Sequence, residues 1–125
     1  MHVTLAYPLS WPPGRPRTPA GQREMPRFAK DKSFGAARDE LLRELVRLGA
    51  QNIVLSTDVE LKADGDPYAN RRPPNDLGVA VYFQDRRGRA LCFSCDRWQR
   101  IEANLLMRNY GGFLGGSGTK AKGRN

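Results

Sequence analysis

Residues 78–110 read GVAVYFQDRRGRALCFSCDRWQRIEANLLMRNY and predict a β-hairpin followed by a helix. Apolar residues at every second position mark the two strands: Val79, Val81 and Phe83 in the first, and Leu91, Phe93 and Cys95 in the second. This two-residue period is typical of strands. Turn-forming residues over Asp85–Gly88 separate them. We expect the rest of the chain to pack on this hairpin.

The segment after the hairpin carries the pattern of a helix start. The carboxylate of Asp96 can accept hydrogen bonds from unpaired backbone N–H groups, and the side chain of Gln99 can reach back toward it. One helical face would then carry Trp98, Ile101 and Leu105. Residues 109–112 predict the end of this helix.

Apolar patterns before the hairpin predict a further helix and further strands. A helix over residues 34–48 ends at Gly49. Strand alternation covers residues 2–7 and 53–61, and the second of these can be one long strand or two short ones with a bulge near Thr57. The order predicts an α+β fold, with a mainly antiparallel sheet of four to five strands and two helices packed on one face.

Basic residues are concentrated at the two ends of the chain, which has a net charge of +8 over 125 residues. Residues 1–32 predict an N-terminal strand and a Pro- and Arg-rich arm, with six basic and two acidic side chains. Residues 33–110 predict the core, and residues 111–125 a flexible basic tail rich in Gly and Lys. Four basic residues and no acidic one lie from position 108 onward, whereas residues 33–107 are neutral.

Two basic arms suit the neutralisation of phosphates in a nucleic acid or a nucleoprotein. They equally suit a protein that uses its charge only to stay in solution. The candidate contacts to nucleic acid or another partner are Trp11, Arg15, Arg17, Arg71, Arg72, Lys120, Lys122 and Arg124. Trp11 can pin the arm to the body or stack on a base. The proline-rich arm can also be a ligand for a groove on a partner.

The loop over residues 66–77 is long for a connection without structure of its own, and such loops are often functional. Tyr68, Arg71 and Arg72 could form a second basic and aromatic contact surface there. The alternative is a solvated connection between strands.

Cys92 and Cys95 have the C-x-x-C spacing of metal and redox sites. Zinc requires four ligands, whereas the chain has no second cysteine pair and its single histidine is His2. A regular strand would also point the two thiols to opposite faces. We therefore expect reduced core thiols, with a redox pair as the alternative.

Asp76 and Asp96 flank the hairpin and are candidate carboxylates for a metal-dependent nuclease. The cap pattern accounts for Asp96, however, and the sequence contains neither a nucleophile–base set nor a phosphate loop. We expect no catalytic residue, metal or cofactor. The chain has no long apolar run and no secretory signal, so we expect a cytoplasmic protein without a membrane partner.

Several separate segments carry a family resemblance: Tyr7–Pro12, Pro16–Thr18, Gly49–Thr57, Gly78–Phe83 and Cys95–Trp98. Together they resemble a family of small uncharacterised proteins from proteobacteria, their phages and mobile elements, some of which are labelled J-domain-containing. The His-Pro-Asp tripeptide of J domains is absent here, and the chain departs from the family after Leu106. The resemblance implies a phage or mobile-element origin and no particular reaction. We expect a non-enzymatic accessory protein that binds nucleic acid or a nucleoprotein, or alternatively an anti-CRISPR-type inhibitor of a bacterial defence protein.

Overall fold

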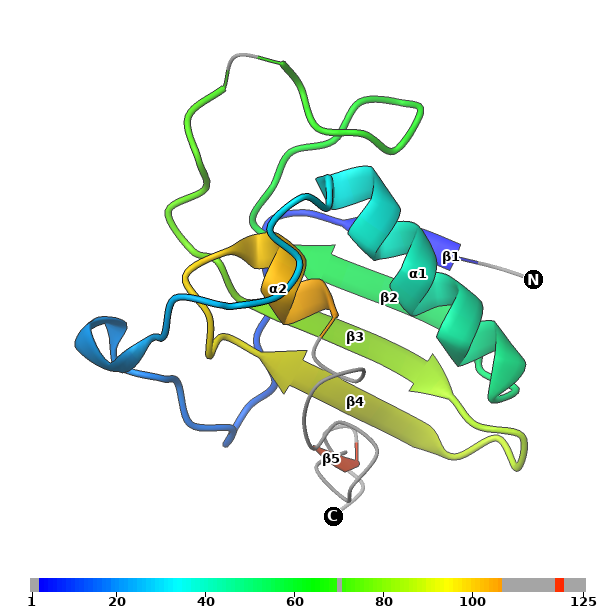
Figure 1. Cartoon of the computed structure of the whole chain (residues 1–125). Coiled ribbons are helices and arrows are strands. Elements are labelled where there is room, and N and C mark those ends of the chain that lie inside the picture. The colour runs from blue at the N-terminus through cyan, green and yellow to red at the C-terminus, as the bar shows by residue number, and fades with distance from the viewer. Residues whose placement is uncertain (1–2, 70, 107–118, 121–125) are drawn as a thin grey trace.

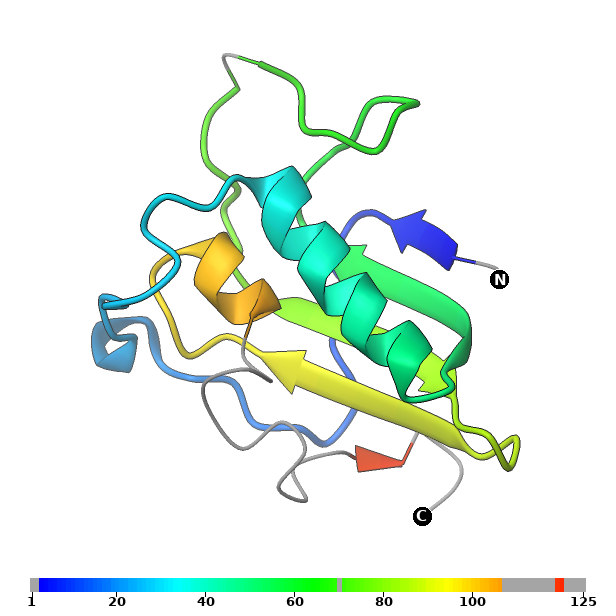
Figure 2. The same cartoon turned by 45° about the vertical axis from the view of Figure 1, so that its right-hand side comes forward.

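A computed structural model describes residues 3–69, 71–106 and 119–120 of the chain. These residues form a five-stranded sheet with two α-helices on one of its faces (Figures 1 and 2). The elements in chain order are β1 (Val3–Ala6), the 3-10 helix η1 (Ala20–Gln22), α1 (Phe34–Arg47), β2 (Gln51–Thr57), β3 (Val79–Gln84), β4 (Ala90–Cys95), α2 (Ile101–Leu105) and β5 (Thr119–Lys120).

The strands lie side by side in the order β1-β2-β3-β4-β5. β1 is parallel to β2, and each of the other neighbouring pairs is antiparallel. The parallel pair requires a long crossover, which the arm and α1 provide. The predicted α+β class, the mainly antiparallel sheet and the two helices on one face are therefore confirmed.

The core lies between the sheet and the two helices. The helices bury Phe34, Ala37, Leu41, Leu45, Ile101 and Leu105 against the sheet side chains Ile53, Leu55, Val79, Val81, Phe83 and Phe93. The Ser33 hydroxyl caps α1 by accepting a hydrogen bond from the Ala36 N–H at 3.0 Å. Gly49 ends the helix with φ of 89°, a conformation that favours glycine. The first helix is thus where the apolar pattern predicted it.

The second helix begins later than predicted. α2 starts at Ile101, and its N-cap residue Arg100 makes no side-chain cap. The prediction that Asp96 caps this helix is wrong, because its carboxylate accepts the backbone N–H of Thr18 instead, at 3.0 Å. The helix also ends earlier than predicted: α2 stops at Leu105 with Leu106 as its C-cap, whereas the sequence predicted an end at 109–112, which lies outside the described residues.

Contacts from distant parts of the chain hold the segment between β4 and α2 extended. The Glu24 N–H donates to the carbonyl of Arg97 at 3.0 Å, and the Gln99 N–H donates to the carbonyl of Glu24 at 2.9 Å. The buried side chain of Asn104 accepts the Trp98 N–H at 3.0 Å. These contacts satisfy the Arg97 carbonyl and the N–H groups of Trp98 and Gln99 without a helix.

β2 is shorter at its C-terminal end than the alternation to residue 61 predicted. Thr57 pairs with Val79, which is the first residue of β3, so the antiparallel pairing ends there. The Thr57 hydroxyl also accepts the Val59 N–H at 3.3 Å, as chains do where they turn. The register shift between β2 and β3 lies between Gln51 and Val54, and not near Thr57 as predicted.

The N-terminal arm crosses the face of the sheet that the helices leave uncovered (Figure 1). Ser10 donates its N–H to the hydroxyl of Ser56 at 2.7 Å, and its carbonyl accepts the Tyr82 hydroxyl at 2.6 Å. Gly78 permits the close approach, because a Cβ there would lie 3.1 Å from Cζ3 of Trp11. The arm is therefore packed against the domain over this stretch, and Trp11 pins it.

Candidate nucleic-acid interface

Two carboxylates hold the side chain of Arg17, one of the predicted contact residues. Its Nε donates to Oδ2 of Asp96 at 2.8 Å, and its Nη2 donates to Oδ1 of Asp76 at 2.6 Å. The hydrogen bond to Asp76 is the main cause that raises the pKa of Arg17. The same guanidinium lies 4.3 Å from the ring centroid of Trp11. Arg17 and Trp11 therefore both hold the arm against the domain, and Arg17 covers one face of the Trp11 indole.

Asp76 and Asp96 are brought together, as the nuclease hypothesis required, but Arg17 bridges them. Burial acts to raise the pKa of Asp76, and the hydrogen bonds from Arg17 and the Gly78 N–H outweigh it, so the pKa is lowered. A second arginine approaches from the arm, with Nη2 of Arg23 3.7 Å from Asp96. Among the described residues, no group of three or more His, Cys, Asp or Glu side chains could hold a metal ion.

The two cysteines lie on opposite faces of β4. Cys92 is buried opposite Tyr82 in the register, on the face that the arm crosses, whereas Cys95 packs against the core beneath the helices. Burial raises the pKa of Cys92 to about 11 and also raises the pKa of Cys95. High pKa values disfavour the thiolate that redox chemistry and metal binding require. The expectation of buried thiols fits this geometry.

In the loop, Arg71 contacts Tyr68, whereas the Arg72 side chain forms no described contact with either residue. The Arg71 guanidinium lies 4.5 Å from the ring centroid of Tyr68 and 3.1 Å from the carboxylate of Glu60. Arg72 is exposed and forms no ion pair with another described residue. Arg15, in the arm, uses its carbonyl to accept the indole N–H of Trp11 at 3.0 Å.

A basic surface that the sequence interpretation missed lies where the β3–β4 turn meets the end of α1 (Figures 1 and 2). We call it the basic end, and it consists of Arg43, Arg47, Arg86, Arg87 and Arg89. The two elements touch, because a Cβ added at Gly49 would overlap the side chain of Arg86. Glycine at this position therefore brings the turn against the helix end.

The carboxylates near the basic end compensate only part of its charge. Arg47 pairs with Glu44 at 2.6 Å, and Arg89 pairs with Asp85 at 2.8 Å. The three remaining arginines, Arg43, Arg86 and Arg87, form no ion pair with any other residue that the structure describes, and all three are exposed. Five arginines against two carboxylates leave a local excess of positive charge.

β5 pairs with the first half of β4, the strand that follows the β3–β4 turn. Its residue Lys120 pairs with Leu91, the second residue of β4, and Thr119 pairs with Cys92. Because β5 runs antiparallel to β4, the chain is heading toward the β3–β4 turn at Lys120. The predicted contacts Lys122 and Arg124 lie outside the described residues.

A sum of charges along the chain does not reveal the basic end, because it does not show which charges lie together in the fold. Residues 33–107 are neutral in sum, yet the fold separates their charges. The carboxylates of Asp58, Glu60, Asp76 and Asp96 follow or precede the strand ends that lie farthest from the β3–β4 turn. A signal was available in the sequence, since residues 86–89 read RRGR at a predicted hairpin tip.

Comparison of the chain with family models, curated proteins and solved structures found no match. No helix in the described part of the chain is long and apolar enough to cross a membrane.

Proposed function

We propose that the protein binds nucleic acid, alone or in a nucleoprotein, and that the basic end supplies its main phosphate contacts. The C-terminal residues Lys120, Lys122 and Arg124 remain predicted phosphate contacts in this proposal. In this proposal the protein is an accessory factor of phage or mobile-element origin that contributes binding and no reaction of its own.

The observation that carries the proposal is the gathering of Arg43, Arg86 and Arg87 at one end without acidic partners. Phosphate contacts from arginine and lysine supply most of the affinity in sequence-independent binding, through the release of counterions. Arginine also matches the phosphate group with two parallel hydrogen bonds. The basic end has the residue type, exposure and uncompensated charge that such contacts need.

The proposal shifts the main contacts away from the N-terminal arm. Arg17 already has two carboxylate partners, and Arg71 has one. To reach a phosphate, each side chain would first have to leave a partner that it holds. Arg43, Arg86 and Arg87 carry no such cost.

The test is fluorescence anisotropy with short single- and double-stranded DNA and RNA across a salt series. The triple variant Arg43→Ala, Arg86→Ala, Arg87→Ala should weaken binding and reduce the slope of log K against log salt by about 3, if each arginine neutralises one phosphate. The matched control is Arg27→Ala, Lys30→Ala, Arg72→Ala, which removes the same charge from exposed residues without described ion pairs.

The control variant should retain most of the affinity and of the salt slope. Equal losses in both triple variants would overturn the assignment of the contacts to the basic end. If the wild-type chain bound none of the four probes at low salt, the proposal of nucleic-acid binding would be wrong. The partner to seek would then be a protein, such as a component of a bacterial defence system.

A further inference from the structure

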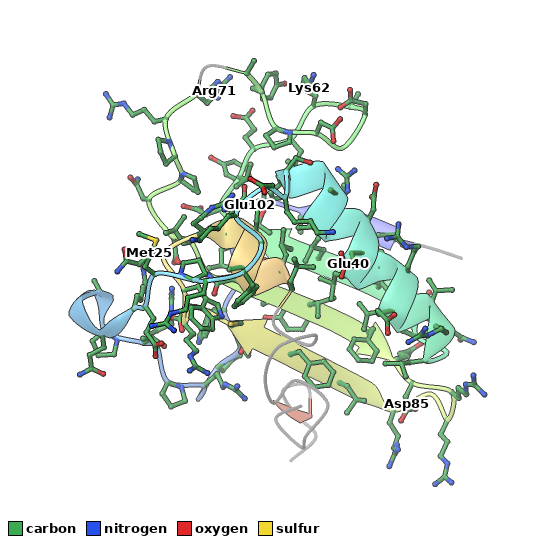
Figure 3. All side chains as sticks on the ribbon, viewed as in Figure 1. Met25, Glu40, Lys62, Arg71, Asp85 and Glu102 are labelled. Atoms are coloured by element: carbon green, nitrogen blue, oxygen red, sulfur yellow. The ribbon has the colours of Figure 1, made fainter. Side chains whose placement is uncertain are left out.

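A cleft lies at the end of the molecule opposite the basic end, with a volume of about 490 Å³. It is bounded by loop residues 67–68 and 71–75, the chain that leaves β2 and the first residues of α1 and α2. Figure 3 places Arg71 and Asp85 at opposite ends of the molecule. Three aromatic rings and three carboxylates contribute to the lining: Tyr7, Phe34 and Tyr68, and Asp58, Glu60 and Glu102.

An internal arginine already occupies part of this cleft. The Arg71 guanidinium lies over the ring of Tyr68, 4.5 Å from its centroid, with its Nη1 3.1 Å from Oε1 of Glu60. An aromatic face combined with a carboxylate is a common way in which proteins hold a guanidinium, through cation–π attraction and charge-assisted hydrogen bonds. We call this arrangement the Arg71 seat.

The Arg71 seat is easily exchanged. The side chains of Arg71 and Glu60 are 58% and 49% exposed, and ion pairs at such sites are weak because water and salt screen them. Tyr68 is also exposed. Water can therefore replace each contact of Arg71 at little cost, and a second guanidinium can compete for the same place.

The cleft has further groups that Arg71 does not use. The carboxylate of Asp58 lines it and forms no ion pair or hydrogen bond with another residue in the described ranges. Tyr7 presents a second aromatic ring, which is 53% exposed. Glu102, which pairs with Arg100 at 3.2 Å, adds a third carboxylate. An entering cation would thus find more acidic and aromatic groups than Arg71 contacts.

We propose that this cleft binds an arginine side chain of a partner protein, and that Arg71 is an internal competitor for the seat formed by Tyr68 and Glu60. The three lining carboxylates outnumber the two lining arginines, Arg71 and Arg72, so the cleft favours a cation over a phosphate and does not extend the nucleic-acid surface. A planar guanidinium can stack on an aromatic ring and pair with a carboxylate at once, which a compact ammonium group does less well. The proposal is independent of the proposed function, because it uses none of the residues of the basic end.

The experiment is an NMR titration of the full-length, ¹⁵N-labelled chain with N-acetyl-arginine methylamide, up to about 10 mM, a range that covers weak recognition of a single side chain. The citrulline analogue has nearly the same shape without the charge, and the lysine analogue has the charge without the planar group. Backbone shifts near Tyr68 and Glu60 report binding, and the same spectra show that each variant is folded.

Arg71→Ala is the decisive variant. Removal of an internal competitor should tighten binding of the arginine probe about threefold or more, because the binding-competent fraction rises. Arg72→Ala is the matched control, since it removes the same charge from a neighbouring residue that also lines the cleft but has no described contact with Tyr68 or Glu60. In the Arg71→Ala chain, Tyr68→Ala and Glu60→Gln should each weaken binding about two- to fivefold, the range for exposed contacts.

The proposal would be overturned if Arg71→Ala and Arg72→Ala bound the probe equally well, because general electrostatics would then explain any gain. It would also be overturned if the citrulline probe bound as tightly as the arginine probe, or if no chain showed shifts at the cleft. A tighter Arg71→Ala complex that also discriminates against citrulline would support it. These results do not depend on whether the basic-end variant loses nucleic-acid binding, because the two surfaces share no residue.

Discussion

Nε of Arg17 lies 2.8 Å from Oδ2 of Asp96, which joins residues 79 positions apart in the sequence. The Asp96 side chain is only 4% exposed, and it also accepts the Thr18 N–H at 3.0 Å. A buried carboxylate needs such donors, because it has lost the water that would otherwise solvate it. The arm therefore supplies the charge and hydrogen bonds that allow Asp96 to sit at the end of β4.

Substitution Arg17→Ala should destabilise the protein by about 2 kcal/mol, since it leaves Asp96 buried with fewer partners. The figure is below that for a fully buried pair because the Arg17 side chain is 38% exposed. Urea denaturation followed by circular dichroism measures the change. Arg27→Ala, which removes an exposed arginine of the same arm, should change stability by less than about 0.5 kcal/mol. Equal effects of the two substitutions would show that the ion pair between Arg17 and Asp96 does not stabilise the fold.

Stability should fall at high pH through the phenol of Tyr82. Burial is the main cause that raises its pKa to about 12, whereas an unfolded tyrosine has a pKa of about 10. Between these values the folded chain binds more protons than the unfolded chain. The free energy of unfolding therefore decreases as pH rises from about 10 to about 12, and this contribution is fully present below pH 10.

Urea denaturation from pH 9 upward measures this dependence. Tyr82→Phe should reduce the slope without abolishing it, because the raised pKa of Cys92, about 11, also lowers stability as pH rises. The substitution should cost about 1 kcal/mol at neutral pH because the hydrogen bond to the Ser10 carbonyl is lost. Tyr68→Phe is the matched control and should keep the wild-type slope, since Tyr68 is exposed. A wild-type slope in the Tyr82→Phe chain would show that another group titrates.

Cys92 should resist alkylation in the native protein. Its raised pKa of about 11 leaves about one thiolate in a thousand thiols at pH 8, and the residue is also buried. In the chain with Cys95→Ser, iodoacetamide should modify Cys92 at least about a hundredfold more slowly in buffer than in urea. Mass spectrometry follows the reaction. A native rate close to that in urea would mean that the arm exposes this face of the sheet.

Periodicity predicted the parts of the fold whose neighbours lie nearby in the sequence. The α1 pattern begins after a capping serine and ends at a glycine, and both signals are local. The hairpin has a two-residue period on each side of a turn in which Asp85 accepts the N–H groups of Arg87 and Arg89. Local chemistry determines such elements, so the sequence was sufficient.

The features that were predicted wrongly or missed depend on contacts between distant residues. Asp96 has the local pattern of a helix cap, but Arg17 and Thr18 outcompete the helix for its oxygens. The basic end combines arginines of α1 with arginines of the hairpin, which meet where Gly49 lies against Arg86, and a charge count along the chain cannot show that meeting. The cleft likewise forms only where a loop, two helices and the end of β2 meet.

The packing of the arm on the sheet should depend on the missing side chain of Gly78. A Cβ there would lie 3.1 Å from Cδ2 of Leu9 and 3.1 Å from Cζ3 of Trp11, so both side chains would have to shift. Gly78→Ala should therefore destabilise the protein by about 1–3 kcal/mol, the range for overpacking. It should also speed tryptic cleavage after Arg17 and Arg23, which follow the displaced segment.

Gly21→Ala is the matched control, because a Cβ at that position meets nothing within 4 Å and its φ needs no glycine. It should leave stability unchanged or raise it slightly by restricting the unfolded chain. If both alanine variants were cleaved at the wild-type rate, the arm would not depend on this close approach.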